Sequence, residues 1–164
     1  MPPHPPEPWL RGPREDVHPL VMPVFFSFAQ VREDLARHMA GIRPDAVWKT
    51  LGGNSLGFQL KHIAGSVDRL TTYLMGDQLS AQQLAFLPNE LQPPGTVEEL
   101  VAAIDQSLAK SEEQLRRLNP ASLYDSRSVG RQALPTSVLG LLIHLCEHTQ
   151  RHLGQAITFA KMLR

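Results

Sequence analysis

The sequence predicts an all-α protein, a four-helix bundle preceded by a proline-rich N-terminal arm. Four long segments repeat apolar residues at helical spacing, and several of their ends carry helix-capping residues. No run of residues alternates convincingly between apolar and polar side chains, as a half-buried strand would. Four such helices are typical of a bundle, and 164 residues are enough for one domain with a substantial core.

The predicted arm covers residues 1–23, which hold eight of the 14 prolines. Proline at this density excludes both a regular helix and a central strand. Four apolar side chains can hold the segment on the domain surface, namely Trp9, Leu10, Leu20 and Val21. We therefore expect a partly ordered arm over residues 1–23 and a bundle over residues 24–164.

The first two helices are expected over residues 24–42 and from Leu56 to about residue 75. Pro44 bars a simple continuation of the first helix. In the second helix, Asn54 or Ser55 is the expected N-cap and Gly76 the expected stop. The apolar positions of the second helix repeat at alternating spacings of four and three, as in a bundle seam: Leu56, Leu60, Ile63, Val67, Leu70 and Leu74.

The second half of the chain is expected to contain two helices and two connections. Residues 77–95 form a long connection with one short helix around residues 80–86, and connections of this length are often functional or wrap a neighbour. The third helix opens at Thr96, whose capping box is completed by Glu99, and ends at Asn119 and Pro120. Residues 120–135 are expected to be irregular, and the fourth helix begins near Thr136 and runs to the C-terminus.

Composition excludes several classes of partner. Lys plus Arg and Asp plus Glu both number 16, so no basic surplus points to nucleic acid or to an anionic membrane. The longest apolar run, around residues 138–145, is too short to span a bilayer, and the N-terminus shows no apolar signal-peptide segment. A single cysteine suits a reducing compartment. We expect a cytoplasmic protein.

The most informative motif is the pair His148 and His152, four residues apart in the last helix. At about 100° per residue the two imidazoles lie side by side, close enough to hold one metal ion. They fall within roughly 40° of the apolar stripe, so we expect them to point toward the core, where a metal would satisfy both rings. That stripe consists of Val138, Leu141, Leu145, Ala156, Phe159 and Leu163. The alternative is a pair of core histidines hydrogen-bonded to backbone or side chains.

The third ligand is expected from a facing helix, and His62 in the second helix is the best candidate. It lies roughly 120° from the leucine seam of its own helix, so it would line a separate cleft between helices, where Gly65 leaves room. The alternative is a hydrogen-bonded or exposed histidine without a metal.

Other residues are expected to contribute less. Position 149 is Thr, whereas a zinc protease needs Glu directly after the first His of such a pair. We interpret His144 as a rim or surface residue, His38 as exposed, and His4 and His18 as uninformative. Cys146 lies about 200° round the helix from His148 and is expected to be a small buried apolar side chain. The sequence identifies no catalytic acid, base or nucleophile.

Two blocks of the chain resemble a known family. Residues 54–63, Asn-Ser-Leu-Gly-Phe-Gln-Leu-Lys-His-Ile, resemble the second-helix signature of the DinB-like superfamily, also called YfiT-like. The pair His148 and His152, followed by Gly154 and Gln155, resembles the last-helix run of that family, which often ends His-Arg-Gly-Gln. Leu153 stands where the family usually has Arg. The resemblance spans roughly residues 24–164.

The resemblance implies a fold and a metal site. It implies a bundle, often a homodimer, with a divalent metal, commonly zinc or nickel, bound by His62, His148 and His152. Characterised relatives include transferases and isomerases that use low-molecular-weight thiols such as bacillithiol or mycothiol.

Three neutral imidazoles leave a metal with its full charge and an open position, which lowers the pKa of a bound water or thiol. The thiol would be an external cosubstrate, because the single cysteine is badly placed. Gln155 is expected to orient a ligand or brace the adjacent helix, and Gly154 to permit close packing. Tyr124 and Arg127, from one of the two long connections, are candidate substrate contacts.

Two function classes follow from this chemistry. The first is a metal-dependent thiol S-transferase, or a related hydrolase, that acts on small electrophiles. The alternative is a non-catalytic metal-binding module of a stress response.

Overall fold

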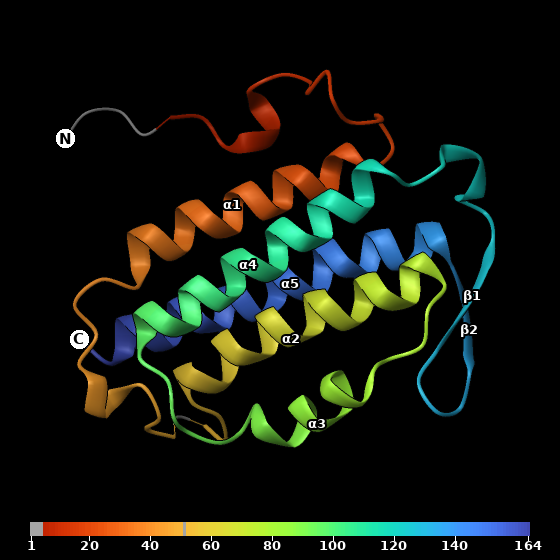
Figure 1. Ribbon diagram of the computed structural model, residues 1–164. Helices are drawn as coiled ribbons and strands as arrows, with labels where there is room; N and C mark the ends of the chain where they lie inside the picture. The colour runs from red at the N-terminus through yellow and green to blue at the C-terminus, as the bar shows by residue number, and fades with distance from the viewer. Residues whose placement is uncertain (1–4, 51) are drawn as a thin grey trace.

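The computed structural model describes residues 5–50 and 52–164, and four long helices dominate this part of the chain (Figure 1). They are α1 (Met22–His38), α2 (Leu56–Met75), α4 (Val97–Arg116) and α5 (Val138–Met162), and the shorter α3 (Ala81–Asn89) lies beside α2. Short 3₁₀ turns occur at Pro8–Leu10, Pro44–Ala46 and Pro120–Ser122. The predicted all-α four-helix bundle is confirmed.

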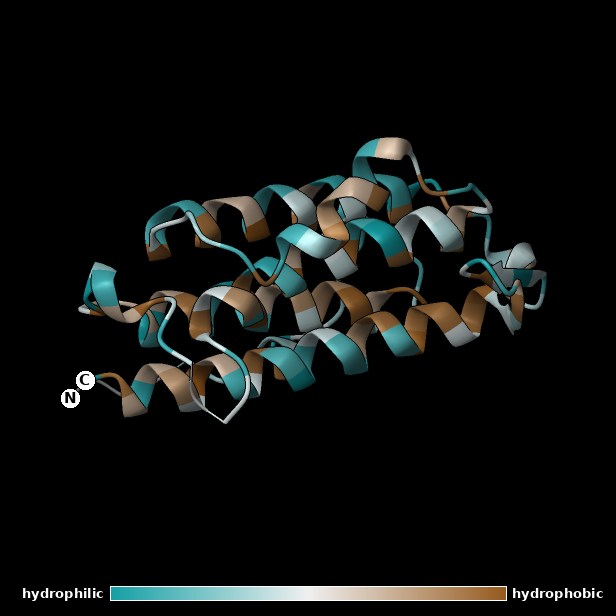
Figure 2. Cartoon of the chain, turned by 90° about the horizontal axis from the view of Figure 1, so that it is seen from below, coloured by the Kyte–Doolittle hydropathy of each residue, from teal (hydrophilic) through white to brown (hydrophobic). Residues whose placement is uncertain are grey.

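The core lies between the four long helices, with α2 packed along α4 and α5, and α1 along α5. Figure 2 shows both hydrophobic and hydrophilic bands along these helices, as expected where one face of each is buried. The largest fully buried side chains of the core include Phe25, Phe28, Leu60, Ile63, Leu108 and Leu145. Among the described helices, none has the length and apolarity needed to cross a membrane.

The predicted caps set the ends of α2 and α4. Ser55 is the N-cap of α2, where its hydroxyl accepts the Phe58 N–H at 3.1 Å, and Gly76 ends the helix with φ of 92°. At α4 the capping box is present, because Thr96 and Glu99 each accept the other's backbone N–H.

The first helix differs from its predicted bounds. It begins at Met22 because Pro23 fits the first turn of a helix, whose N–H groups need no intrahelical acceptor. It ends at His38, and Gly41 with φ of 78° then turns the chain. Met39 and Ile42 remain buried beyond the helix end, so their apolar spacing reflects burial and not helix length.

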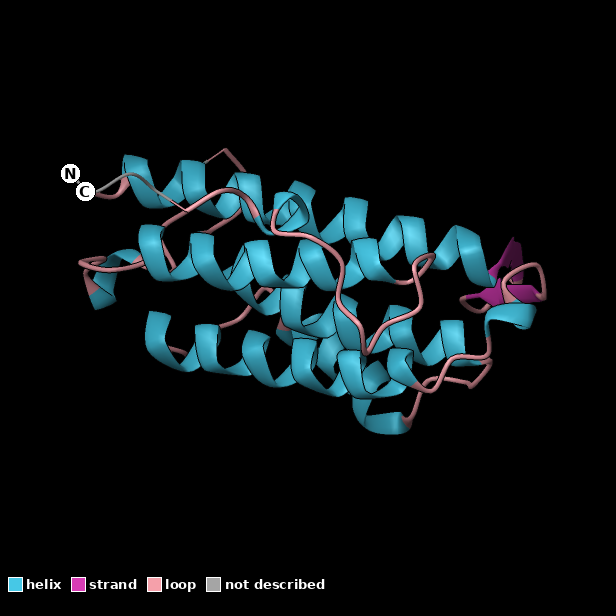
Figure 3. Cartoon of the chain, turned by 90° about the horizontal axis from the view of Figure 1, so that it is seen from above, coloured by secondary structure: helices cyan, strands magenta, loops and turns pink. Residues whose placement is uncertain are grey.

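The prediction that residues 120–135 form an irregular connection is wrong. Within the connection expected to be irregular, β1 (Ser126–Val129) pairs antiparallel with β2 (Leu134–Ser137). Figures 1 and 3 place this hairpin at the end of the bundle opposite the C-terminus. The strands have four residues each and none of these residues is fully buried, so the sequence carries no alternating apolar pattern there.

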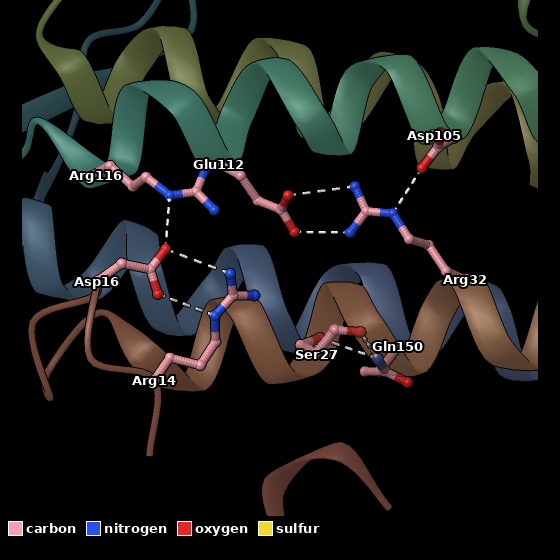
Figure 4. Close-up of polar contacts among 8 residues, drawn as sticks. All are labelled: Arg14, Asp16, Ser27, Arg32, Asp105, Glu112, Arg116 and Gln150. Carbon is pink, nitrogen blue, oxygen red and sulfur yellow. Dashed lines mark hydrogen bonds and ion pairs between the residues drawn. The ribbon is translucent and has the colours of Figure 1, made fainter. Parts of the chain in front are cut away.

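The N-terminal arm is held to the bundle by ion pairs and two buried valines. Arg11 pairs with Glu33 of α1, and Asp16 pairs with Arg116 of α4 (Figure 4). Val17 and Val21 are buried in the core. Arm residues 1–4, including His4, lie outside the described residues, and the division of the chain at residue 23 stays a prediction.

Candidate metal centre

The middle of α2 and the middle of α5 bring the three predicted ligands together. Because α2 and α5 pack along each other, His62 faces His148 and His152. One ring nitrogen from each of the three side chains can be chosen so that all lie within 4.8 Å of one another. Three half-buried imidazoles from two helices thus converge on one point.

The distances within this histidine cluster suit one small cation. Nε2 of His62 lies 2.9 Å from Nε2 of His148, and the ring centroid of His152 lies 4.3 Å from that of His62. Two imidazole nitrogens on a tetrahedral zinc ion, at about 2.0–2.1 Å each, are about 3.3 Å apart. For this pair of nitrogens, a shift of a few tenths of an ångström would accommodate the ion.

His62 is oriented by a carboxylate on the side away from the cluster. Its Nδ1 lies 2.7 Å from Oε2 of Glu90, the residue that follows α3. With Nδ1–H donated to Glu90, the neutral ring carries its lone pair on Nε2, which faces the other histidines. Phe58 stacks on the same ring at a centroid distance of 5.3 Å and restricts its rotation.

Glu90 is itself fixed by Arg69 of α2. Glu90 is only 3% exposed, and its Oε1 lies 2.7 Å from Nη1 of the buried Arg69. Gly65 makes room for this ion pair, since a Cβ at that position would lie 2.5 Å from Glu90 Oε1 and 2.7 Å from Arg69 Nη1. The space that we predicted beside Gly65 is therefore filled by a carboxylate and a guanidinium.

His152 is oriented by a glutamine relay between α2 and α5. Its Nδ1 lies 2.7 Å from Oε1 of the fully buried Gln59, and Nε2 of Gln59 donates to Oε1 of Gln155 at 2.9 Å. His152 therefore donates a hydrogen bond from Nδ1–H, and the lone pair on its Nε2 is left to bind a metal. The predicted brace between Gln155 and the adjacent helix is confirmed.

Electrostatics keep the α5 histidines neutral at pH 7. Burial, followed by the proximity of His62, lowers the pKa of His148 to about 4. The same two causes, in the same order, lower the pKa of His152 to about 4. A neutral imidazole is the form that binds a metal, so these two rings can bind a cation without first losing protons. Among the described residues, none partners the buried Nδ1 of His148.

The histidine pair lies at the edge of the core and not at its centre, which corrects our prediction. The residues of α5 that are buried beside them are Thr149 and Leu153, while Phe159 of the predicted stripe is half-buried. Thr149 can occupy the core because its hydroxyl donates to the Leu145 carbonyl at 2.7 Å. All three histidines lie half-buried at this edge of α2, where His62 faces α5.

Several other predicted residues lie away from the cluster. Arg127 donates to the Leu74 carbonyl at 2.8 Å near the end of α2, about 18 Å along the helix from His62. Tyr124 is exposed in the same connection. Neither residue lines the histidine cluster, so their prediction as substrate contacts is wrong.

The minor residues on α5 have mixed outcomes. His144 is exposed at the rim, with its ring centroid 5.1 Å from that of His148. Cys146 is half-buried, and burial raises its pKa to about 11. Gly154 is exposed, and a Cβ there would meet nothing within 4 Å, so its predicted role in close packing is wrong. Elsewhere in the chain, His38 is half-buried and not exposed as expected.

Glu90 is the functional residue that sequence reasoning missed. A signal for it exists, because Glu90 is the only charged residue between Asp77 and Glu98. A lone carboxylate in a neutral segment of that length is a candidate for a specific buried contact. Gln59 and Arg69 lie on α2 within two turns of His62, but helical spacing alone did not assign them a role.

In a comparison with known protein families, one family model matches the region that contains the histidine cluster. A model of the DinB superfamily matches residues 27–156, which include all three histidines as well as Gln59, Arg69 and Glu90. No curated protein matches the chain.

Proposed function

This chain belongs to the DinB superfamily, and on that premise we propose that His62, His148 and His152 bind one divalent metal ion, zinc or nickel. The observation that carries the proposal is the convergence of three imidazoles, of which His62 and His152 are oriented through their outer nitrogens by Glu90 and Gln59. Orientation of ligand rings by a second set of hydrogen bonds is typical of metal sites.

We further propose that the protein is a metal-dependent thiol S-transferase, or a related hydrolase, that acts on small electrophiles. A divalent ion bound by three neutral ligands supplies Lewis acidity that lowers the pKa of a coordinated thiol or water. The chain's single thiol is a poor nucleophile, because burial raises the pKa of Cys146 to about 11. The thiol is therefore an external cosubstrate, a low-molecular-weight thiol such as bacillithiol or mycothiol.

The chain's own residues contribute positioning. Glu90 and Gln59 hold the rings of His62 and His152, while Phe58 and the exposed His144 border the cluster. The half-buried position of the three histidines leaves an approach for a small substrate from the edge of the α2–α5 interface.

Turnover assays test the enzymatic proposal. Metal-loaded protein is assayed with a panel of low-molecular-weight thiols and small electrophiles, and thiol consumption is followed. We expect metal-dependent turnover that His152→Ala abolishes and that His18→Ala, a change at an exposed arm histidine, leaves intact. Absence of turnover across the panel, or turnover unchanged in His152→Ala, would contradict the proposal.

A second candidate is a metal-binding module without catalysis. The three candidate ligands come from two different helices, and this favours the second function, because an ion bound by both α2 and α5 would hold the two helices together. This function predicts a higher Tm on metal addition and no reaction with any thiol and electrophile pair.

A further inference from the structure

A cavity lies on the opposite flank of α5 from the histidines. It is a groove of about 990 Å³ between the arm, α1 and α5. Its apolar lining includes Trp9, Leu20, Phe26, Leu142 and Ile143. A volume of this size is that of a site for one small organic molecule.

The groove and the metal centre use different faces of α5. Ile143, Cys146 and Gln150 line the groove, whereas His148 and His152 face α2. At 100° per residue the two sets lie roughly 160° apart around the helix. A ligand in the groove would therefore not touch the histidine cluster.

Polar contacts build the walls and floor of this groove. The arm wall is held by two hydrogen bonds from Arg11 to Glu33 at 2.6 and 2.8 Å. At the floor, Gln150 of α5 donates to the hydroxyl and carbonyl oxygens of Ser27 in α1 at 2.9 and 3.0 Å (Figure 4). The arm is thus fixed while the apolar side chains of Trp9 and Leu20 stay exposed.

Large apolar side chains remain exposed in the groove as a result. Trp9 is 60% exposed, Leu20 55% and Ile143 62%. Grouped exposure of this kind, beside a concave surface, marks a binding site and not ordinary surface. This apolar surface favours a ligand whose body is apolar.

The charged residues that line the groove favour a ligand whose polar end is positively charged. Among the described residues that line it are three carboxylates, Glu7, Asp34 and Glu147, and no Lys, Arg or His. Arg37 pairs with Asp34 and Arg151 with Glu147 from outside the lining. Glu7 has no basic partner among the described residues, and its Oε2 accepts the indole N–H of Trp9 at 2.6 Å.

We propose that this groove binds a small amphiphilic cation, such as an alkyl or aryl amine. The apolar body lies against Leu20, Leu142 and Ile143, and the ammonium group lies by the Glu7 carboxylate and the Trp9 ring. An ammonium is attracted both by a carboxylate and by the face of an indole. A second copy of the chain is disfavoured, because a symmetric contact here would bring the same carboxylates of two copies together.

Calorimetric titration of the full chain with three probes of equal length tests this assignment. The probes are dodecylammonium, dodecanol and dodecanoate, each below its micellar concentration. We expect saturable binding of one dodecylammonium per chain, with a Kd at least ten-fold lower than that of dodecanoate and with dodecanol between them. Glu7→Gln with Glu147→Gln should reduce this charge preference to less than three-fold.

A matched pair of variants localises the binding. Ile143→Arg places a cation in the groove and should weaken dodecylammonium binding at least ten-fold. Met162→Arg makes the same change at a similarly exposed position of α5 outside the groove, and should bind as the unmodified chain does. His148→Ala should also bind the probe normally, which separates this site from the proposed metal centre.

Three results of the binding experiments would overturn the proposal. They are equal affinity for the three probes, no saturable binding, and equal loss of binding in both arginine variants. A concentration-dependent dimer that Ile143→Arg dissociates and Met162→Arg does not would also overturn it, because a second copy would then fill the groove.

Discussion

His62 and Glu90, 28 positions apart in the chain, are joined by a 2.7 Å contact between Nδ1 and Oε2. This contact attaches the connection after α3 to the proposed metal centre on α2. Because Arg69 holds the other oxygen of the same carboxylate, the orientation of His62 depends on a buried ion pair. The first two predictions test that dependence.

Replacing Glu90 with Gln should weaken metal binding and lower stability. Loss of the orienting carboxylate should raise the metal Kd by about 10–100-fold. The unpaired Arg69 should lower the free energy of unfolding by about 3 kcal/mol. Competition with a chromophoric chelator and urea denaturation measure the two effects. Glu98→Gln, at an exposed position of α4, is the control, and a Kd equal to that of the control would refute the role of Glu90.

Gly65→Ala and Gly154→Ala form a matched pair in the middle of two helices. The new Cβ at position 65 would collide with the Glu90–Arg69 pair, and overpacking of this kind typically costs about 1–3 kcal/mol. At position 154 the Cβ enters open space, and helix propensity predicts a gain of up to about 1 kcal/mol. Thermal and urea unfolding check the two signs. Equal effects at the two sites would show that the space around Gly65 is not constrained.

Gln59→Leu should uncouple His152 from its orienting relay. The variant removes the acceptor of His152 Nδ1–H and leaves a half-buried ring nitrogen unpaired, which costs roughly 1–3 kcal/mol. Metal affinity should fall about ten-fold. Gln155→Ala, which removes only the outer end of the relay, should have a smaller effect on both quantities. The reverse order would contradict the relay.

The metal-free protein should lose stability on acidification. The pKa values of His148 and His152 are about 4 in the folded chain and about 6.5 when unfolded. Between these values the unfolded chain binds more protons, so the free energy of unfolding falls as the pH decreases from about 6.5 to about 4. Urea denaturation across this range measures the slope. The double variant His148→Gln, His152→Gln should show a shallower slope, and an unchanged slope would assign the effect elsewhere.

Helical periodicity and capping residues predicted most of the fold. The seam of α2, its Ser55 and Gly76 ends and the capping box of α4 are local signals, and each is present in the structure. The hairpin was missed because its strands have only four residues each and none of these residues is fully buried, so the sequence shows no alternating apolar pattern there.

The candidate site was predictable as far as it depends on single helices. Spacing brings His148 beside His152, and the rotation of His62 away from its leucine seam correctly indicated a position at the helix edge. Glu90 was not predictable from spacing, because its approach to His62 depends on the path that the chain takes after α3. Arg127 was misplaced for the same reason, since the hairpin lies at one end of the bundle.

Metal analysis of protein purified without an affinity tag or added metal tests the central claim most directly. The account predicts about one equivalent of zinc or nickel per chain, lost in His62→Ala and in His152→Ala and retained in the control His18→Ala. Full metal content in His62→Ala would contradict the account. So would an unmodified protein that stays metal-free after incubation with zinc or nickel.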